Sequence, residues 1–148
     1  MQITRTADYG VRVMTHLAMR PAGSRATVSH LAEESHASVA FAGKILQRLV
    51  AARLLVSHRG YEGGFELARP ASRISMLEIV SALEGRMCLN DCLPGGKGCE
   101  RQAWCAAHGV WADAQAALAG VLAAESLEQL AAISSRNRAR LEAANVQF

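Results

Sequence analysis

The segment from residue 27 to residue 53 carries two short helical patterns, each opened by a residue that can cap a helix. Thr27 can accept a hydrogen bond from the first free backbone N–H groups of a helix that runs to about Ser35. Ser38 can do the same for a helix in SVAFAGKILQRLVAAR. The chain between them is long enough only for a tight turn. This pattern is typical of a helix-turn-helix.

A β-hairpin is predicted directly after the second helix. Residues 54–58 and 65–68 are short strand-like runs, the segment between them is rich in glycine, and Pro70 ends the second run. A hairpin in this position converts a helix-turn-helix into a winged helix, with the hairpin as the wing. Arg59 lies at the base of this wing, where its guanidinium could enter a minor groove or bind a phosphate.

The second helix separates into two faces when its residues are placed about 100° apart. Its packing face is apolar and comprises Phe41, Ala42, Ile45, Leu46, Leu49 and Val50. The other face is small, polar and basic and comprises Ala40, Gly43, Lys44, Gln47 and Arg48. A helix that faces only solvent would show similar polar residues. The small Ala40 and Gly43 favour a helix that approaches another surface closely, such as a DNA major groove.

Basic residues are concentrated in the front half of the chain. Residues 1–75 contain ten Lys or Arg against five Asp or Glu, and residues 76–148 contain six against eight. An excess of positive charge in the half that carries the helix-turn-helix is expected of a protein that binds a polyanion.

Helices are also predicted before and after the winged helix, over residues 6–20, 75–84, 106–124 and 126–144. Ser126 and Gln129 form a capping box at the start of the last one. The expected fold class is mainly α with a small β-hairpin: a winged helix-turn-helix DNA-binding domain plus a long dimerisation helix. The 106–124 helix carries an apolar stripe of Val110, Trp111, Ala114, Leu118, Val121 and Leu122. We expect a homodimer along this stripe, with packing inside one subunit as the alternative.

Three regions are expected: a winged-helix DNA-binding domain in residues 1–84, a cysteine-rich loop in 85–108, and dimerisation and C-terminal helices in 109–148. No apolar run reaches the ~18 residues of a membrane span, and charge precedes any signal-like apolar run. We therefore expect a cytoplasmic protein with no membrane partner. The sequence has no nucleophile and base arrangement and no G-x4-GK loop, so we do not expect an enzyme.

All four cysteines lie within CLNDCLPGGKGCERQAWCAAH, residues 88–108. In a reducing compartment, clustered cysteines favour metal binding or redox chemistry over structural disulfides. Cys92, Cys99 and Cys105 form no C-x2-C knuckle of the structural zinc type, and His108 follows one helical turn after the last of them. This spacing favours an iron–sulfur cluster and leaves zinc, or free or redox-switching thiols, as alternatives.

With these motifs the chain resembles the IscR/NsrR-type family of winged-helix iron–sulfur transcription regulators. The resemblance covers nearly the whole chain and rests on ITRTADYGVRVM, on FAGKILQRLVAARLLVSHRGYEGGFELARP and on the cysteine triad. It implies a dimeric regulator whose affinity for a double-stranded DNA operator depends on a 2Fe-2S or 4Fe-4S cluster that responds to redox state, nitric oxide, or iron or cluster supply. The alternatives are a zinc- or thiol-based regulator, or an iron–sulfur protein that does not bind DNA.

The resemblance implies three cluster thiolates, Cys92, Cys99 and Cys105. In the IscR-like pattern a histidine three residues after the last cysteine is the fourth ligand, and His108 stands there. In the NsrR-like pattern an acidic residue of the partner's first helix can serve, and Asp8 occupies a corresponding place, where it could instead pair with Arg12. This chain has one more residue than the IscR-like pattern between the first two ligand cysteines, and it adds Cys88 as a further candidate.

For the DNA contacts we expect Lys44 and Gln47 at base edges, Ser38 and Arg48 on phosphates, and Arg59 in the wing. Gly43 stands where some family members carry a glutamate, which leaves the operator preference open.

Overall fold

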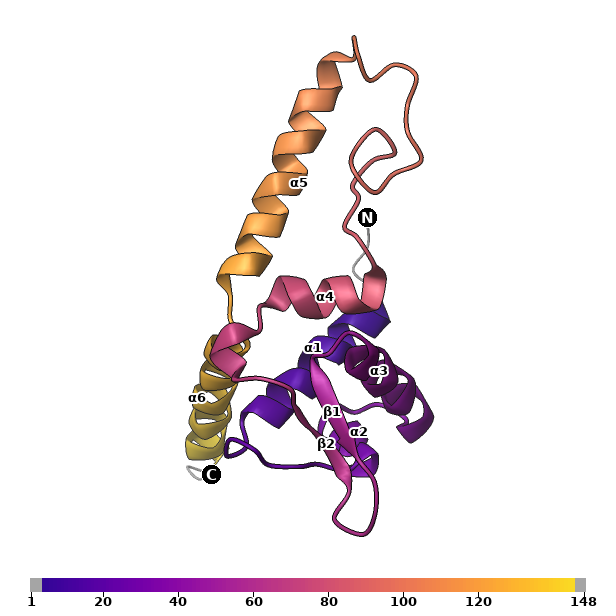
Figure 1. Ribbon diagram of the computed structural model, residues 1–148. Coiled ribbons are helices and arrows are strands. Elements are labelled where there is room, and N and C mark those ends of the chain that lie inside the picture. The colour runs from indigo at the N-terminus through magenta and orange to yellow at the C-terminus, as the bar shows by residue number, and fades with distance from the viewer. Residues whose placement is uncertain (1–3, 146–148) are drawn as a thin grey trace.

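A computed structural model describes residues 4–145. The chain runs through α1 (Arg5–Ala18), α2 (Val28–Glu34), α3 (Val39–Ala51), β1 (Leu55–His58), β2 (Gly64–Leu67), the 3-10 turn η1 (Ala71–Arg73), α4 (Met76–Glu84), α5 (Ala106–Ala124) and α6 (Leu127–Asn145). The strands pair antiparallel, with Leu55 opposite Leu67 and His58 opposite Gly64. The predicted winged-helix fold is confirmed (Figure 1).

The predicted helix starts are confirmed by their side-chain hydrogen bonds. Thr27 Oγ1 accepts from the backbone N–H of His30 at 3.3 Å, and Ser38 Oγ accepts from that of Phe41 at 3.2 Å. Ser126 and Gln129 form the predicted capping box, with Gln129 N–H donating to Ser126 Oγ at 3.2 Å. These bonds satisfy donors that the first turn of a helix leaves free, so local sequence sets where each helix begins.

The core of the winged-helix domain lies between α1, α3 and α4. Its buried apolar side chains include Val13, Met14, Leu17, Ile45, Leu46, Leu49, Ile79 and Leu83. The predicted packing face of α3 is therefore confirmed. At Gly10 the helices α1 and α4 approach so closely that a Cβ would overlap Cδ1 of Leu83. A residue larger than glycine at this position would force α1 and α4 apart or push the Leu83 side chain out of place.

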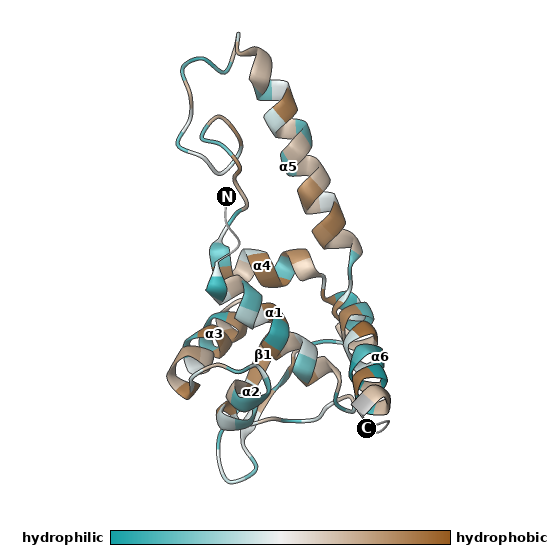
Figure 2. Ribbon diagram, turned by 180° about the vertical axis from the view of Figure 1, so that it is seen from behind, coloured by the Kyte–Doolittle hydropathy of each residue, from teal (hydrophilic) through white to brown (hydrophobic). Residues whose placement is uncertain are grey.

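Helix α5 stands away from this domain, and α6 returns to pack beside α1 (Figure 1). Hydrophobic positions recur along α5 (Figure 2). Leu122 near the end of α5 is buried, whereas Val110 and Val121 are 66% and 65% exposed. Leu127 and Ala131 of α6 are buried against the domain. The α5 helix is thus packed on its own chain at its C-terminal end and bonded at its middle, where Gln115 Oε1 accepts the backbone N–H of Leu89, and it leaves most of its length uncovered.

The junction of α5 and α6 is bonded to the segment that precedes α4. Met76 donates its backbone N–H to the carbonyl of Glu125 at 2.9 Å, and Leu127 donates to that of Ile74 at 2.8 Å. The chain that leaves at the end of α4 therefore returns beside the start of α4. Within residues 4–145, no helix is long and apolar enough to cross a membrane.

Candidate DNA-binding surface and cysteine segment

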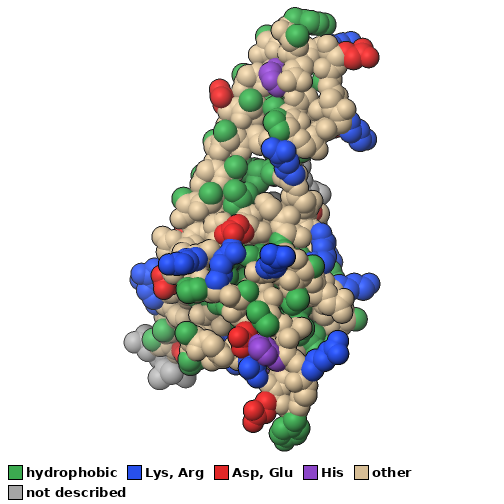
Figure 3. Space-filling view, viewed as in Figure 1, with side chains coloured by type: hydrophobic (Ala, Val, Ile, Leu, Met, Phe, Trp, Pro, Cys, Tyr) green, Lys and Arg blue, Asp and Glu red, His purple; other side chains and the backbone are tan. Residues whose placement is uncertain are grey.

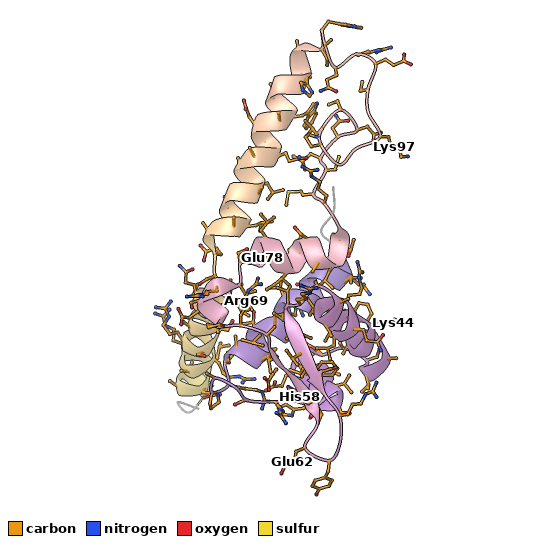
Figure 4. The ribbon with its side chains drawn as sticks, viewed as in Figure 1. Lys44, His58, Glu62, Arg69, Glu78 and Lys97 are labelled. Carbon is orange, nitrogen blue, oxygen red and sulfur yellow. The ribbon has the colours of Figure 1, made fainter. Side chains whose placement is uncertain are left out.

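The exposed face of α3 carries the side chains predicted to read DNA. Lys44 and Gln47 are exposed, whereas Ile45 and Leu46 next to them are buried. Figure 4 shows Lys44 pointing away from the body of the domain. Lys and Arg side chains are spread over the surface of the same domain in Figure 3. Lys and Gln side chains that carry hydrogen-bond donors and are exposed on one helix face are of the kind that can reach base edges.

Ser38 is exposed at the start of α3, where its Oγ accepts the N–H of Phe41. A hydroxyl that accepts one hydrogen bond keeps its own proton for donation. Ser38 can therefore cap the helix and donate to a phosphate oxygen at the same time.

Gly43 faces a neighbouring helix as well as solvent. A Cβ built at Gly43 would lie 3.8 Å from Cγ2 of Val28 in α2, an ordinary van der Waals distance. Its small size is compatible with the packing of α2 against α3, and an alanine would fit in the same space.

Arg48 is engaged with another part of the domain. Its guanidinium donates a hydrogen bond to the backbone carbonyl of Leu83 in the last turn of α4. A phosphate contact, as predicted for Arg48, would compete with this bond. Sequence spacing could not reveal the bond because the two residues are 35 positions apart.

The wing is anchored by a cluster of polar side chains that the sequence did not single out. Arg25 Nε lies 3.1 Å from Oε2 of Glu66, and Arg25 also donates to the carbonyl of Glu62 at 3.4 Å. His58 Nε2 lies 3.1 Å from the same Glu66 oxygen. The hydrogen bond from Arg25 lowers the pKa of Glu66 below its ordinary value of 4.5, burial opposes the shift, and His58 and the charge of Arg25 add to it. Arg59 itself is exposed on this anchored hairpin.

The first helix contributes an aromatic contact to α3. The ring of Tyr9 meets that of Phe41 edge to face at 5.4 Å, and the guanidinium of Arg12 lies 5.2 Å from the centre of the Tyr9 ring. Asp8 pairs with Arg12 at 2.8 Å, which is the alternative to metal ligation that its spacing suggested. Both members of this pair are about half exposed.

All four cysteines belong to the described part of the chain and are free thiols. Cys99 is exposed, Cys92 and Cys105 are half-buried, and the thiol of Cys88 donates to the carbonyl of Asn90 at 3.0 Å. Among residues 4–145, no three His, Cys, Asp or Glu side chains lie where they could share a metal ion. Cys92, Cys99 and Cys105 precede α5 and His108 lies within it, and the described structure does not bring three of these side chains together.

His108 lies in the first turn of α5, and its side chain is available for a further bond. Within residues 4–145, its Nδ1 is buried and has no hydrogen-bond partner, while its backbone N–H donates to the carbonyl of Cys105 at 3.1 Å. Cys105 stands at the N-cap position of α5 but makes no side-chain capping bond, and His108 follows it by about one turn. Three soft thiols and a free imidazole nitrogen fit the ligand chemistry of an iron–sulfur cluster.

A family model described as an iron-dependent transcriptional regulator, Rrf2, matches residues 3–133. An HTH-type transcriptional regulator of Mycobacterium tuberculosis is 38% identical over 85 residues; the match takes in 57% of this chain and 53%, about half, of that protein. The HTH-type transcriptional regulator IscR of Xenorhabdus nematophila is 28% identical over 130 residues, or 88% of this chain and 79% of IscR.

Solved structures show the same architecture. CymR of B. subtilis, described as the global cysteine regulator, superposes with a TM-score of 0.70 at 25% sequence identity. The superposition covers 90% of this chain and 98% of CymR. The likeness therefore extends over most of the chain.

Proposed function

Because this chain belongs to the Rrf2 family of transcriptional regulators, we propose that it is a homodimer whose affinity for a DNA operator depends on an iron–sulfur cluster held by residues 88–108. Its relatives are transcriptional regulators and not enzymes. The observation that carries the cluster is the donor set: three thiols precede an imidazole whose Nδ1 is buried without a partner in the described residues.

On the DNA side, we assign Lys44 and Gln47 to base edges, Ser38 to a phosphate and Arg59 to the groove beside the wing. In a symmetric dimer the two α3 helices would enter major grooves about 34 Å apart. The bond from Arg48 to Leu83 supports a role for Arg48 in linking α3 to α4.

On the metal side, Cys92, Cys99 and Cys105 would hold the cluster with His108 as fourth ligand. The partner's Asp8 and the chain's own Cys88 remain the alternative fourth ligands, although Asp8 pairs with Arg12. When bound, an iron–sulfur cluster supplies a redox-active centre whose potential depends on its ligands and their hydrogen bonds.

The cysteine segment is connected to α3, the helix that we assign to the DNA major groove, through the end of α4. The segment starts after Gly85, two residues beyond Leu83, whose carbonyl accepts the hydrogen bond from Arg48. Thr4 at the start of α1 donates to the carboxylate of Glu84. A change in the path of residues 85–105 would therefore act on residues bonded to both α1 and α3.

The uncovered length of α5 supports the homodimer. Val110, Trp111 and Val121 are 66%, 43% and 65% exposed on one helix that stands away from its own domain. Pairing two such helices would bury these side chains and set the distance between the two winged helices. Leu122 belongs to the predicted stripe but is buried within its own chain.

The experiment that tests the proposal is anaerobic purification of the full chain, followed by visible absorption and measurement of iron and acid-labile sulfide. We expect a brown protein with bound iron. The variant with Cys92, Cys99 and Cys105 replaced by Ala should be colourless and still a folded dimer, and its DNA affinity should no longer respond to oxidation. Protein that stays colourless and iron-free after reconstitution with ferrous salt and sulfide contradicts the proposal.

A zinc- or thiol-based regulator with the same DNA contacts is the second candidate. The exposed Cys99 and the absence of any disulfide among the four described cysteines favour it, because exposed thiolates react with oxidants. Colourless protein that contains zinc, or a metal-free protein whose DNA affinity changes on reversible oxidation, would support this candidate instead.

A further inference from the structure

Tyr61 is the outermost aromatic side chain of the wing. It is fully exposed, with a relative accessibility of 107%, in the turn between β1 and β2. The neighbouring Glu62 marks the tip of the wing in Figure 4, at the end of the domain opposite α5. Arg59 is the only residue of this hairpin for which the sequence predicts a DNA contact. No contact within the described chain accounts for an aromatic ring at this position.

The turn that carries Tyr61 is stabilised by hydrogen bonds at its backbone. Gly63 donates its N–H to the carbonyl of Gly60 at 3.0 Å, and a Cβ at Gly63 would come within 2.6 Å of the carbonyl oxygen of His58. Arg25, in the segment between α1 and α2, donates to the carbonyl of Glu62. A ring displayed from such a turn loses little conformational freedom when it binds, because a tyrosine has only two side-chain torsions.

The surroundings of Tyr61 suit a nucleic acid backbone. Arg59 lies two residues away and is exposed, and the carboxylate of Glu66 on the same hairpin is occupied by Arg25. Glu62, next to Tyr61, is also exposed, so a phosphate must approach the ring from the side of Arg59. A deoxyribose offers an apolar face beside a phosphate, and a tyrosine offers an apolar ring beside a hydroxyl donor. Along the edge of a minor groove, the tyrosine ring could pack on a deoxyribose while its hydroxyl donates to the neighbouring phosphate.

We propose that Tyr61 is a DNA-contacting residue of the wing, with its ring against a deoxyribose and its hydroxyl donating to the adjacent phosphate. The inference rests on the proposed DNA-binding function and extends it to a residue other than the basic ones. Tyr61 supplies an uncharged part of the affinity, whereas Arg59 supplies a charged part. The two parts respond differently to salt, because only neutralised phosphates release counterions.

The test measures binding of the full-length protein to a duplex selected from a random pool by the wild-type protein, over a series of salt concentrations. Tyr61→Ala should weaken binding roughly twentyfold at every salt concentration, and Tyr61→Phe roughly fivefold, the loss of one hydrogen bond. Neither should change the slope of affinity against salt. Arg59→Ala should reduce that slope by about 1. The thermal midpoint of Tyr61→Ala should equal that of the wild type.

Lys44→Ala separates this inference from the proposed function. If Tyr61→Ala binds as tightly as the wild type while Lys44→Ala loses affinity, the role of Tyr61 is wrong and the DNA-binding surface stands. If Lys44→Ala and Arg59→Ala also bind as the wild type does, both the inference and the assigned surface are wrong. A change of salt slope in Tyr61→Ala would also overturn the uncharged contact.

Discussion

Arg48 of α3 donates a hydrogen bond to the backbone carbonyl of Leu83, in the last turn of α4. The carbonyls of a last turn lack partners within the helix and carry the negative end of its dipole, so a guanidinium is well suited to them. Two residues later, at Gly85, the chain enters the cysteine segment. The helix that carries Lys44 and Gln47 is thus bonded to the element that leads to the predicted ligands.

For Arg48→Ala we expect a loss of about 1 kcal/mol in the free energy of unfolding, because a part-buried hydrogen bond from a charged group is removed. The DNA affinities of cluster-loaded and cluster-free protein should also become more alike. Urea denaturation and paired binding measurements check the two effects. If Arg48 binds a phosphate instead, the salt slope of binding will fall by about 1 and the stability will be unchanged.

Replacing Gly10 by alanine should destabilise the winged-helix domain. The new Cβ would overlap the buried side chain of Leu83, and overpacking of this kind typically costs about 1–3 kcal/mol. The midpoint of urea unfolding measures the loss. Gly43→Ala is the matched control within a helix, because its Cβ would meet only Val28 at 3.8 Å. That variant should be more stable by about 0.5–1 kcal/mol, and equal destabilisation by both would contradict the packing argument.

Substitutions at Ser38 should separate its two roles. Ser38→Ala removes the cap of α3 and should cost about 1 kcal/mol of stability together with DNA affinity. Ser38→Asp keeps a capping oxygen but places a negative charge against phosphate, so stability should be kept and affinity lost. Thr27→Ala in α2 removes an equivalent cap and should lower stability alone. Wild-type affinity in Ser38→Asp would show that this residue does not face a phosphate.

Charge placed on the exposed face of α5 should prevent dimerisation. Trp111→Glu combined with Val121→Glu would put two carboxylates where apolar side chains are 43% and 65% exposed. We expect a folded monomer in sedimentation equilibrium, whereas the wild type should be a dimer at micromolar concentration. Val39→Glu, at an apolar position of α3 that is 49% exposed, is the control and should remain a dimer. A wild-type monomer would contradict the assigned interface.

The stability of the chain should decrease as the pH falls below about 6.5, in part through His16. Burial lowers the pKa of His16 from its ordinary value of 6.5; Arg138, His36 and Arg20 add to the shift and Glu34 opposes it. The unfolded chain therefore binds the proton more readily, so stability is present above pH 6.5 and is lost as the pH falls through the lowered folded pKa. His16→Gln should make the free energy of unfolding depend less on pH below 6.5, as measured by urea midpoints at several pH values. The same pH dependence in the variant and the wild type would contradict this role of His16.

Local signals predicted the fold well because they act within a few residues. The caps at Thr27, Ser38 and Ser126 and the apolar face of α3 each depend on neighbours along the chain, and the structure has each of them. The bonds from Arg48 to Leu83 and from Arg25 to Glu66 join residues 35 and 41 positions apart. Only the folded chain brings such pairs together, so sequence spacing gave no sign of the wing anchor.

The cysteine ligands show a different limit. Spacing placed Cys92, Cys99, Cys105 and His108 within one short segment, but spacing along the chain does not decide whether their side chains meet, and among residues 4–145 no three of them do. The same holds for α5, whose apolar face has no covering surface in the described part of one chain.

The paired bonds between residues 74–76 and 125–127 join the end of α5 to the start of α4. The helix α4, the cysteine segment and α5 therefore form the three sides of a closed triangle (Figure 1). One corner is the bonded junction, one is Gly85, and the third is the bend where the cysteine loop enters α5. Within this triangle Leu89 donates its backbone N–H to Oε1 of Gln115 in the middle of α5 at 2.9 Å, so a change in the path of residues 85–105 would act on α5 through this bond as well as through Cys105. A small movement of the cysteine segment would thus change the direction of α5, and with it the position of the partner subunit that we expect to pair along this helix.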